Sequence, residues 1–246
     1  MKKIGRFLLL LALFSAWFGF QAPVAAHAES TMSCPSGTYD MLDWMTLDSD
    51  LRGGQHLSGS ANPIYTNMQG NKFYWTKGGN GSPWDIQLYD SHYVYLWITE
   101  LVWNSPTTFK KFHGNFNEPL VPRCAKAGTP GSQIYVPDTS YDIYTSCHNY
   151  TTHSLKKGIN QVWGPYTMSF GGNLLGNLPT LVISYRYNCD ASYGNCGDKE
   201  EFYLTQRYGL VQWVHYALVK GTYQQQQKSV FNTLKGGGTT PNFPCF

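Results

Sequence analysis

The sequence predicts an all-β protein, and specifically an antiparallel β-sandwich of the jelly-roll type. Three observations support this prediction. Strand-like runs follow one another at short intervals from residue 72 onward, clusters of Gly, Pro and Asn separate them, and 16% of the residues are aromatic. Such spacing and composition are typical of antiparallel sheets, whereas the three- to four-residue period of a helix is nearly absent. A closed barrel is the alternative architecture.

The first 28 residues have the composition of a secretory signal peptide. They begin with three basic residues, continue with an apolar core over Phe7–Phe20, and end on the small residues of Ala26-His-Ala28. The apolar core is too short for a stable membrane anchor. We therefore expect residues 1–28 to be removed and the mature chain to be secreted or periplasmic, without an anchor.

The net charge of the precursor comes entirely from this leader. The whole chain carries 18 Lys and Arg against 15 Asp and Glu. Lys2, Lys3 and Arg6 are the excess, so the mature chain is close to neutral. A neutral chain has no electrostatic reason to bind nucleic acid or an anionic membrane. We expect the mature protein to be a monomer that binds neither.

Residues 29–71 form a predicted N-terminal extension before a β-sandwich domain over residues 72–246. Apolar residues recur every three or four positions over 38–52, which predicts one short helix that Gly53-Gly54 would end. The Gly-, Ser- and Asn-rich stretch over 53–71 predicts an irregular connection.

Within the sandwich domain, runs enriched in β-branched and aromatic residues predict the strands. Short segments that contain Gly, Pro or Asn predict the turns between them. The predicted strands span Lys72–Thr76, Trp84–Tyr89, Tyr93–Trp103, Thr108–Phe112, Gln133–Val136, Tyr141–Thr145, Gln161–Phe170, Thr180–Asn188, Glu201–Gln206, Leu210–Val219 and Thr222–Phe231.

The strand over 93–103 has two different faces, because successive strand residues point to opposite sides of a sheet. One face is aliphatic, and the other carries the aromatic residues Tyr93, Tyr95, Trp97 and Trp103. Next-but-one residues lie roughly 6.5–7 Å apart, close to the length of one sugar unit, so these rings are spaced to stack on a glycan. The alternative is a core strand that is buried on both faces.

The strands over 210–219 and 222–231 form a predicted hairpin with Lys220-Gly221 as its two-residue turn. The resulting register pairs Val219 with Thr222, Leu218 with Tyr223, Tyr216 with Gln225, His215 with Gln226, and Val214 with Gln227. One face of the hairpin then carries Gln212, Tyr216, Tyr223, Gln225 and Gln227. The other face carries Trp213 and His215.

The polar face of this hairpin predicts the chemistry of a polysaccharide lyase. A neutral Gln can hold a substrate carboxylate, and a Tyr can move the proton at the adjacent carbon, as β-elimination of a uronic-acid polymer requires. The candidate catalytic residues are Tyr223, Tyr216, His215, Gln212 and Arg207. The candidate substrate-binding residues are Tyr93, Tyr95, Trp97, Trp103 and Gln225. The alternatives are a solvated polar edge strand, and a buried histidine held by one hydrogen bond at position 215.

The segment Lys220-Gly-Thr-Tyr-Gln-Gln225 resembles part of the signature of jelly-roll alginate lyases. In that signature a Gly is followed two residues later by a Tyr and two beyond that by a Gln, here Gly221, Tyr223 and Gln225. The resemblance implies elimination chemistry on a uronate polymer. It covers these residues only, because the Gln-x-His and Arg-x-Glu-Leu elements of that family do not occur in this sequence.

Hydrolysis of a glycosidic bond is the other cleavage reaction that the sequence allows, and it needs two opposed carboxyl groups. Glu100 is the first candidate, and its possible partners are Asp85, Asp90 and Glu201. Serine-hydrolase chemistry is not predicted, because no Gly-x-Ser-x-Gly elbow occurs.

No metal or other cofactor is predicted for catalysis. His148 and His153 flank a polar loop, but the sequence offers no evident third ligand. Asp190, Asn195 and Asp198 are spaced to hold a structural calcium ion in one loop, although they lack the EF-hand order.

The six cysteines follow the leader, so an oxidising compartment predicts three disulfides. The pairing expected from their positions is Cys189 with Cys196, Cys124 with Cys147, and Cys34 with Cys245.

The sequence as a whole predicts a secreted protein that binds an extracellular polysaccharide in an aromatic groove. Cleavage by elimination or hydrolysis would make it a polysaccharide lyase or a glycoside hydrolase. The alternatives are a non-catalytic carbohydrate-binding protein and a structural or interaction protein of the envelope.

Overall fold

The computed structural model describes residues 33–45, 56–59, 64–69, 72–77, 82–100, 107–114, 116–128, 131–155, 157–172, 176–206, 208–235 and 245. Ser33–Phe246 form one compact unit. Its strands pair antiparallel throughout the described part of the chain, and the described helix is a single short turn. The predicted all-β, antiparallel class is therefore confirmed.

From residue 72 onward every predicted strand has a counterpart in the structure, while the strands Pro119–Pro122, Cys124–Ala125 and Asn149–Leu155 were not predicted. In chain order the elements are β1 (Tyr39–Asp40), α1 (Met41–Met45), β2 (His56–Gly59), β3 (Ile64–Gln69), β4 (Lys72–Lys77), β5 (Ser82–Tyr89), β6 (Tyr93–Glu100), β7 (Phe109–Phe112), β8 (Pro119–Pro122), β9 (Cys124–Ala125), β10 (Gln133–Val136), β11 (Thr139–Ser146), β12 (Asn149–Leu155), β13 (Gly158–Met168), β14 (Leu178–Cys189), β15 (Cys196–Thr205), β16 (Gly209–Val219) and β17 (Thr222–Lys235).

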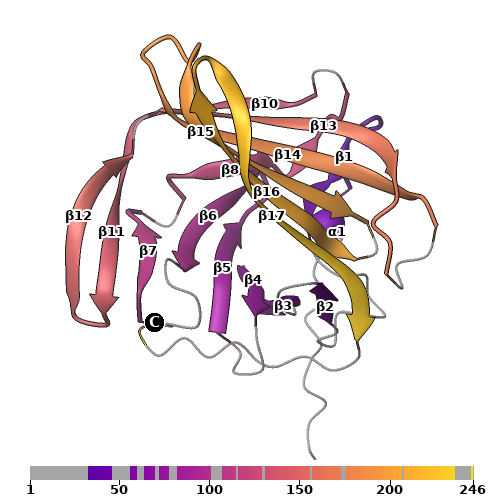
Figure 1. The fold of residues 1–246 in the computed structure, drawn as a ribbon, viewed down its shortest axis with the longest axis horizontal. Helices are drawn as coiled ribbons and strands as arrows, with labels where there is room; N and C mark the ends of the chain where they lie inside the picture. The colour runs from indigo at the N-terminus through magenta and orange to yellow at the C-terminus, as the bar shows by residue number, and fades with distance from the viewer. Residues whose placement is uncertain are drawn as a thin grey trace, which may run out of the picture. The chain divides into compact units, whose positions relative to one another are not determined.

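Most strands belong to one sheet in the order β10-β13-β14-β15-β16-β17-β2-β3-β4-β5-β6-β7-β11-β12, with β8 paired to β6. Figure 1 shows the run from β13 to β17 and the run from β5 to β7 as two sets of adjacent strands. Neighbours in each run are also neighbours in the chain, which is a meander, whereas a jelly roll contains Greek keys. The predicted jelly-roll connectivity is therefore not confirmed.

One hydrophobic core draws on both runs of strands and on α1. Its buried members include Leu42 and Trp44 of α1, Val94 and Leu96 of β6, Phe112 of β7, Leu181 and Ile183 of β14, Phe202 of β15, and Leu210 and Val211 of β16. A second cluster packs on the other side of β6 and contains Ile86, Leu88, Tyr95, Trp97, Ile98 and Phe109. Strand β6 is therefore buried on both faces.

The aromatic residues of β6 consequently belong to the core. Tyr95 is 6% exposed and Trp97 is 8% exposed, so neither ring can stack on a glycan in this structure. Tyr93 at the start of the strand is 36% exposed, and Trp103 lies outside the described residues. The prediction that these rings form a glycan-stacking surface is therefore wrong for Tyr95 and Trp97. The two faces of β6 differ as predicted, but each face packs against a buried cluster and neither faces solvent.

The described part of the N-terminal region contains strands that were not predicted. Within the predicted helix over 38–52 the structure describes α1, whose first turn is capped by the Asp40 carboxylate, which accepts the Leu42 N–H at 3.0 Å. Residues 46–52 lie outside the described part. The stretch expected to be irregular contains β2 and β3, which pair with β17 and β4. Pairing with neighbouring strands outweighs the weak strand propensity of this polar segment.

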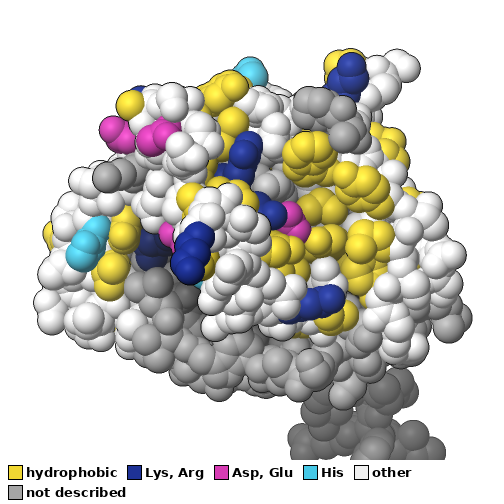
Figure 2. Space-filling view, turned by 45° about the horizontal axis from the view of Figure 1, so that its top comes forward, with side chains coloured by type: hydrophobic (Ala, Val, Ile, Leu, Met, Phe, Trp, Pro, Cys, Tyr) yellow, Lys and Arg dark blue, Asp and Glu magenta, His cyan; other side chains and the backbone are white. Residues whose placement is uncertain are grey.

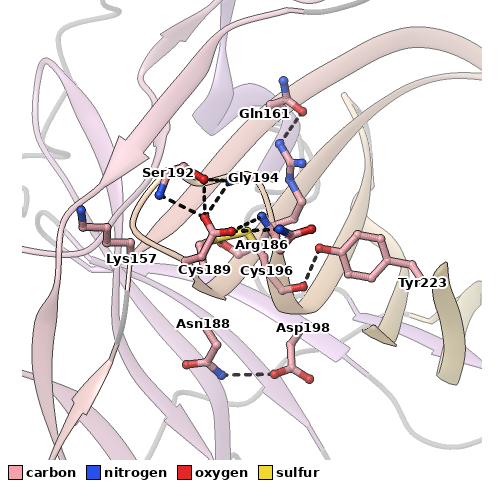
Figure 3. Close-up of a disulfide and its surroundings, with 12 residues drawn as sticks. Lys157, Gln161, Arg186, Asn188, Cys189, Ser192, Gly194, Cys196, Asp198 and Tyr223 are labelled. Atoms are coloured by element: carbon pink, nitrogen blue, oxygen red, sulfur yellow. Dashed lines mark hydrogen bonds between the residues drawn. A yellow bond between two sulfur atoms is a disulfide. The ribbon is translucent and has the colours of Figure 1, made fainter. Parts of the chain in front are cut away.

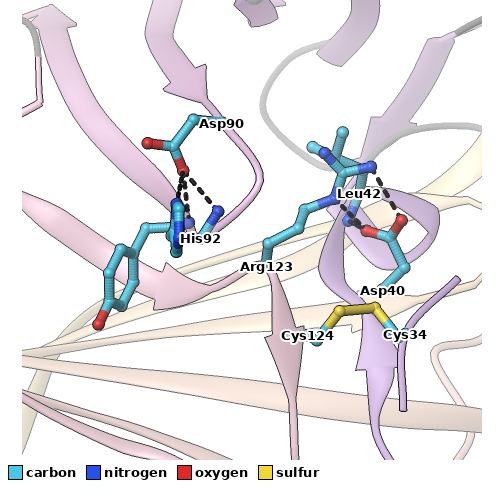
Figure 4. A network of polar contacts seen from close by, with 8 residues as sticks. Cys34, Asp40, Leu42, Asp90, His92, Arg123 and Cys124 are labelled. Atoms are coloured by element: carbon cyan, nitrogen blue, oxygen red, sulfur yellow. Dashed lines mark hydrogen bonds and ion pairs between the residues drawn. A yellow bond between two sulfur atoms is a disulfide. The ribbon is translucent and has the colours of Figure 1, made fainter. Parts of the chain in front are cut away.

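The structure contains three disulfides, Cys34–Cys124, Cys147–Cys245 and Cys189–Cys196. The predicted Cys189–Cys196 pair is confirmed, and the other two predicted pairings are wrong. Cys34 reaches Cys124 because β1 pairs with β9, whose first residue is Cys124. Figure 4 shows this disulfide beside the ion pair of Arg123 with Asp40. Three intramolecular disulfides indicate an oxidising compartment.

No helix in the described part of the chain is both long and apolar enough to cross a membrane.

Candidate functional site

The β16–β17 hairpin positions the side chains that the sequence singled out. Its turn has positive φ at Lys220 (50°) and Gly221 (78°), as a type I′ turn requires. The pairs Val219↔Thr222, Leu218↔Tyr223 and Tyr216↔Gln225 are as predicted.

Beyond these pairs the hairpin contains a bulge that the prediction missed. The register shifts between Tyr216 and His215, so His215 pairs with Gln227 and Val214 with Lys228. The predicted partners Gln226 and Gln227 are therefore each wrong by one residue. A bulge adds one residue to one strand, and here it moves Gln227 to the face of His215 while Tyr216, Tyr223 and Gln225 stay together.

The first candidate site lies on the face of β15, β16 and β17 that carries Lys199, Glu201, Tyr203, Tyr216 and Tyr223. We call it the tyrosine face. Lys199 donates to Glu201 Oε1 at 2.7 Å, and the hydroxyls of Tyr203 and Tyr216 donate to Glu201 Oε2 at 2.7 and 3.1 Å. Figure 2 shows one side of the molecule with hydrophobic, basic and acidic side chains next to one another at its surface. One carboxylate thus fixes two aromatic rings and an ammonium.

The Lys199 ammonium also connects the two tyrosines of the hairpin. Its nitrogen lies 4.0 Å from the ring centroid of Tyr216 and 5.1 Å from that of Tyr223, within the range of cation–π attraction. The Tyr223 hydroxyl donates to the carbonyl oxygen of Cys196 at 2.9 Å, beside the Cys189–Cys196 disulfide (Figure 3). Both rings are therefore held in fixed orientations.

A row of polar groups continues this face across β14, β13 and β10. Arg186 is paired with Lys199 across β14 and β15, and its guanidinium donates to Gln161 Oε1 at 3.0 Å (Figure 3). Gln161 in turn donates to Gln133 Oε1 at 2.6 Å. The buried Arg186 Nε has no hydrogen-bond partner among the described residues. Amide and guanidinium donors of this kind can serve the hydroxyl groups of a ligand.

The tyrosine hydroxyls of this face are proton donors and not bases. Burial, with the charge of Glu201, raises the pKa of Tyr216 to about 12. Burial also raises the pKa of Tyr203 and of Tyr223. A general base needs a pKa near the working pH, so these phenols keep their protons at neutral pH.

The opposite face of the same strands carries His215, apart from Tyr216 and Tyr223 as strict alternation predicted. The imidazole is stacked on Trp213 with an interplanar angle of 9°, and its Nε2 lies 3.5 Å from Asp198. Glu200 accepts hydrogen bonds from the Trp213 indole at 2.8 Å and from the Tyr187 hydroxyl at 3.2 Å. These contacts hold the imidazole in place, but its side chain is 25% exposed, so it is not the buried histidine that the sequence offered as an alternative.

Deeper on this side lies a buried polar group that sequence reasoning missed. Glu118 is 1% exposed and accepts the Tyr185 hydroxyl at 3.3 Å. Burial raises the pKa of Glu118 to about 7, and burial lowers the pKa of Lys110 against the opposing charges of Glu200, Glu118 and Asp85. A carboxyl so deeply buried cannot touch a polymer, so this group bears on stability.

Two of the remaining candidates, Gln212 and Gln225, pair with Tyr203 and Tyr216 of the tyrosine face. Gln212 is 7% exposed beside Tyr203, and Gln225 is exposed on the hairpin. Arg207 and the Glu100 side chain lie outside the described residues. Asp85 is 4% exposed, which leaves it no access to a substrate.

Two aspartates considered for hydrolysis or calcium binding instead organise turns. Asp90 accepts the backbone N–H groups of His92 and Tyr93 at 2.7 and 2.8 Å (Figure 4). Both carboxylate oxygens of Asp190 accept donors from its own loop, including the Asn195 amide at 2.9 Å (Figure 3). No group of three or more His, Cys, Asp or Glu side chains placed to hold a metal ion occurs in the described part of the chain.

The residues that sequence reasoning missed on the tyrosine face are Lys199, Tyr203 and Arg186. Alternation along Lys199-Glu-Glu-Phe-Tyr203 was the available signal, because it places residues 199, 201 and 203 on one side of a strand. Alternation within one strand does not show which strand lies beside it. Lys199 faces Tyr216 only through the β15–β16 register.

No family model, curated protein or solved structure matches the chain. The assignment of function therefore rests on the geometry of its sites.

Proposed function

We propose that this protein is a secreted polysaccharide-binding protein whose glycan-binding surface is the tyrosine face. The observation that carries the proposal is the fixing of Tyr203 and Tyr216 by the single carboxylate of Glu201. Aromatic rings offer an apolar surface to the C–H side of a sugar, while ammonium, amide and guanidinium groups at the rim serve its hydroxyls. Rings held before the ligand arrives lose little conformational entropy when it binds.

The proposed compartment is the periplasm or the extracellular space. The leader over residues 1–28 supports it through its composition. The three disulfides are consistent with it, since they indicate an oxidising environment. The proposed partner is an extracellular polysaccharide, and the proposed state of the mature protein is a monomer.

Binding without cleavage is the version that the electrostatics favour. For β-elimination, Tyr216 or Tyr223 would have to accept a proton, and the raised pKa of each hydroxyl opposes this. A lyase activity centred on Tyr223, and a glycoside hydrolase activity, stay predictions that the same experiments test. An envelope structural protein is the version in which no glycan binds.

The architecture that we propose for this surface is a two-layered sandwich. The core shared by β6, β7, β14, β15 and β16 supports it, because buried side chains of both runs of strands meet there. The meander order of the strands supports the sandwich without the jelly-roll connectivity.

The test is electrophoresis of the purified mature protein in gels that contain uronate or neutral glycans, with absorbance of a new unsaturated bond followed in parallel. We expect retarded migration in at least one glycan gel and no new absorbance. Tyr216→Ala should abolish most of the retardation. Tyr150→Ala is the matched control, because Tyr150 is 53% exposed on β12, away from the tyrosine face. Free migration in every gel contradicts the proposal.

A further inference from the structure

A serine, a histidine and an aspartate form a continuous hydrogen-bonded relay at a place remote in sequence from the tyrosine face. The Ser140 hydroxyl lies 2.8 Å from His113 Nδ1. His113 Nε2 lies 2.7 Å from Asp142 Oδ1. Nucleophilic hydroxyl, imidazole and orienting carboxylate in this order are the parts from which enzymes build an activated serine.

The strand pairing explains why these three side chains meet. Ser140 and Asp142 are next-but-one residues of β11, so both project from one face of the strand. His113 directly follows β7, which pairs with β11 through Phe112↔Tyr141. The His113 backbone N–H also donates to the Ser140 carbonyl at 2.9 Å. His113 is therefore held to Ser140 by both its backbone and its side chain.

The position of the protons follows from Asp142. Burial raises the pKa of this carboxyl, but hydrogen bonds from His113 and from Thr152 (2.8 Å) outweigh it and leave the pKa below its ordinary value. An ionised Asp142 only accepts hydrogen bonds, so His113 Nε2 carries the proton. In the neutral imidazole, His113 Nδ1 then offers its lone pair to the Ser140 hydroxyl, which is the arrangement of a general base.

The relay opens onto a groove of about 880 Å³. Its lining contains both His113 and Ser140, together with Asn117 and the apolar side chains of Phe116, Pro119 and Leu155. This volume is within the range of small-molecule sites. The apolar side chains suit a short acyl group, and the Asn117 amide is a donor of the kind that stabilises an oxyanion.

We propose that Ser140, His113 and Asp142 hydrolyse carboxylic esters that carry a small acyl group. The assignment goes beyond polysaccharide binding and does not depend on it. The serine lies on a strand and lacks a nucleophile elbow, which is why its sequence context does not reveal it.

The reaction balances with water as the second substrate. Ser140 Oγ bonds to the carbonyl carbon while its proton passes to His113 Nδ1. The bond from the carbonyl carbon to the alcohol oxygen then breaks, and the leaving alkoxide takes the proton from the imidazolium. Water next bonds through its oxygen to the acyl carbon while one of its protons passes to His113 Nδ1. The Oγ–carbon bond then breaks, and Ser140 Oγ takes the proton from the imidazolium. The products are one carboxylic acid and one alcohol.

The first test uses p-nitrophenyl acetate with the full-length mature protein. Ser140→Ala should reduce turnover at least ~100-fold, toward the uncatalysed background. Ser146→Ala is the matched control, since Ser146 is an exposed serine of the same strand β11 and does not line the groove, and it should retain the wild-type rate. Equal rates for wild type and Ser140→Ala overturn the proposal, and so does an equal loss in both variants.

A covalent label provides a readout that does not depend on turnover. Diisopropyl fluorophosphate should modify Ser140 in the folded protein, and mass spectrometry of the peptide that contains it identifies the site. Unfolded protein should not be modified there, because its His113 no longer contacts Ser140. A wild-type protein that neither turns over the ester nor takes up the label at Ser140 overturns the proposal.

Asp142 acts as a positioning residue, because it touches the base and not the ester. Asp142→Asn should lower kcat by more than ~10-fold and leave KM nearly unchanged, since the amide can favour the wrong imidazole tautomer. A purely structural role for Asp142 predicts no such split. The glycan gels distinguish the two proposals, because Ser140→Ala should migrate as the wild type does in each of them.

Discussion

The ammonium of Lys199 lies 4.0 Å from the ring centroid of Tyr216. The two residues face each other directly across β15 and β16, and the same ammonium is bound to Glu201. Lys199 therefore fixes the ring by its charge as well as by its packing. The cation lies over the Tyr216 ring, so the proposed glycan-binding site combines a positive charge with an aromatic surface.

Replacement of Lys199 should separate these two contributions. Lys199→Met keeps much of the apolar stem but removes the charge, and we expect it to weaken glycan retardation several-fold. Lys199→Arg should retain most of the binding, because a guanidinium also stacks on aromatic rings. Both side chains of the Lys199–Glu201 ion pair are only 17% exposed, so Lys199→Met should also lower the free energy of unfolding, whereas Lys199→Arg should change it by less than ~1 kcal/mol. Retardation is therefore compared per folded molecule. Unaltered migration of Lys199→Met would exclude the cation from the site.

Stability should fall as the pH rises through neutrality, and Glu118 is the reason. Its pKa is about 7 in the folded protein against an ordinary value of 4.5. The folded state therefore keeps a proton that the unfolded state loses between these values, and the stability that this proton contributes disappears as pH rises. The loss should be about 3 kcal/mol between pH 4.5 and pH 8.

Glu118→Gln is the variant that checks this, because Gln cannot ionise but still accepts the Tyr185 hydroxyl. Urea unfolding at a series of pH values should show a falling free energy for the wild type and a nearly level one for the variant. The lowered pKa values of Asp90 and Asp142 place their protonation changes below this window. The same slope in both proteins would assign the pH dependence to another group.

Local alternation predicted most of the strands from residue 72 onward, because the residues of a half-buried strand alternate between apolar and polar. Strands β8, β9 and β12 were not predicted. In β12 the signal is weak because nearly all of its residues are exposed and polar. Contacts between residues far apart in the sequence could not be predicted from alternation either. His113 meets Ser140 and Asp142 from 27 and 29 positions away, and only the pairing of β7 with β11 brings them together. The sequence pattern predicts individual strands, but a site depends on the register between strands, which the pattern does not give.

The disulfides should contribute unequally to stability. Cys34–Cys124 closes a separation of 90 residues and Cys189–Cys196 one of 7. The loss of chain entropy in the unfolded state corresponds to ~4.6 and ~2.4 kcal/mol at 25 °C for these loops. Replacing each pair with Ala and measuring urea unfolding should therefore show the larger loss for Cys34–Cys124. The short loop also keeps its Asp190 hydrogen bonds. A larger loss for Cys189–Cys196 would mean that the loop depends on its covalent bond.

Tyr93 and Trp97 were both predicted on the aromatic face of one strand, yet their replacement should have different effects on stability. Trp97→Ala removes a ring that is 8% exposed in the cluster around Ile98 and Phe109, and we expect a loss of about 3–5 kcal/mol in the free energy of unfolding. Tyr93→Ala removes a ring that is 36% exposed, so its loss should be about 1 kcal/mol or less. Glycan retardation per folded molecule should be unchanged in both, because neither ring belongs to the tyrosine face. If Trp97→Ala instead folded with wild-type stability and lost glycan binding, β6 would be the platform and the tyrosine face would not be the site.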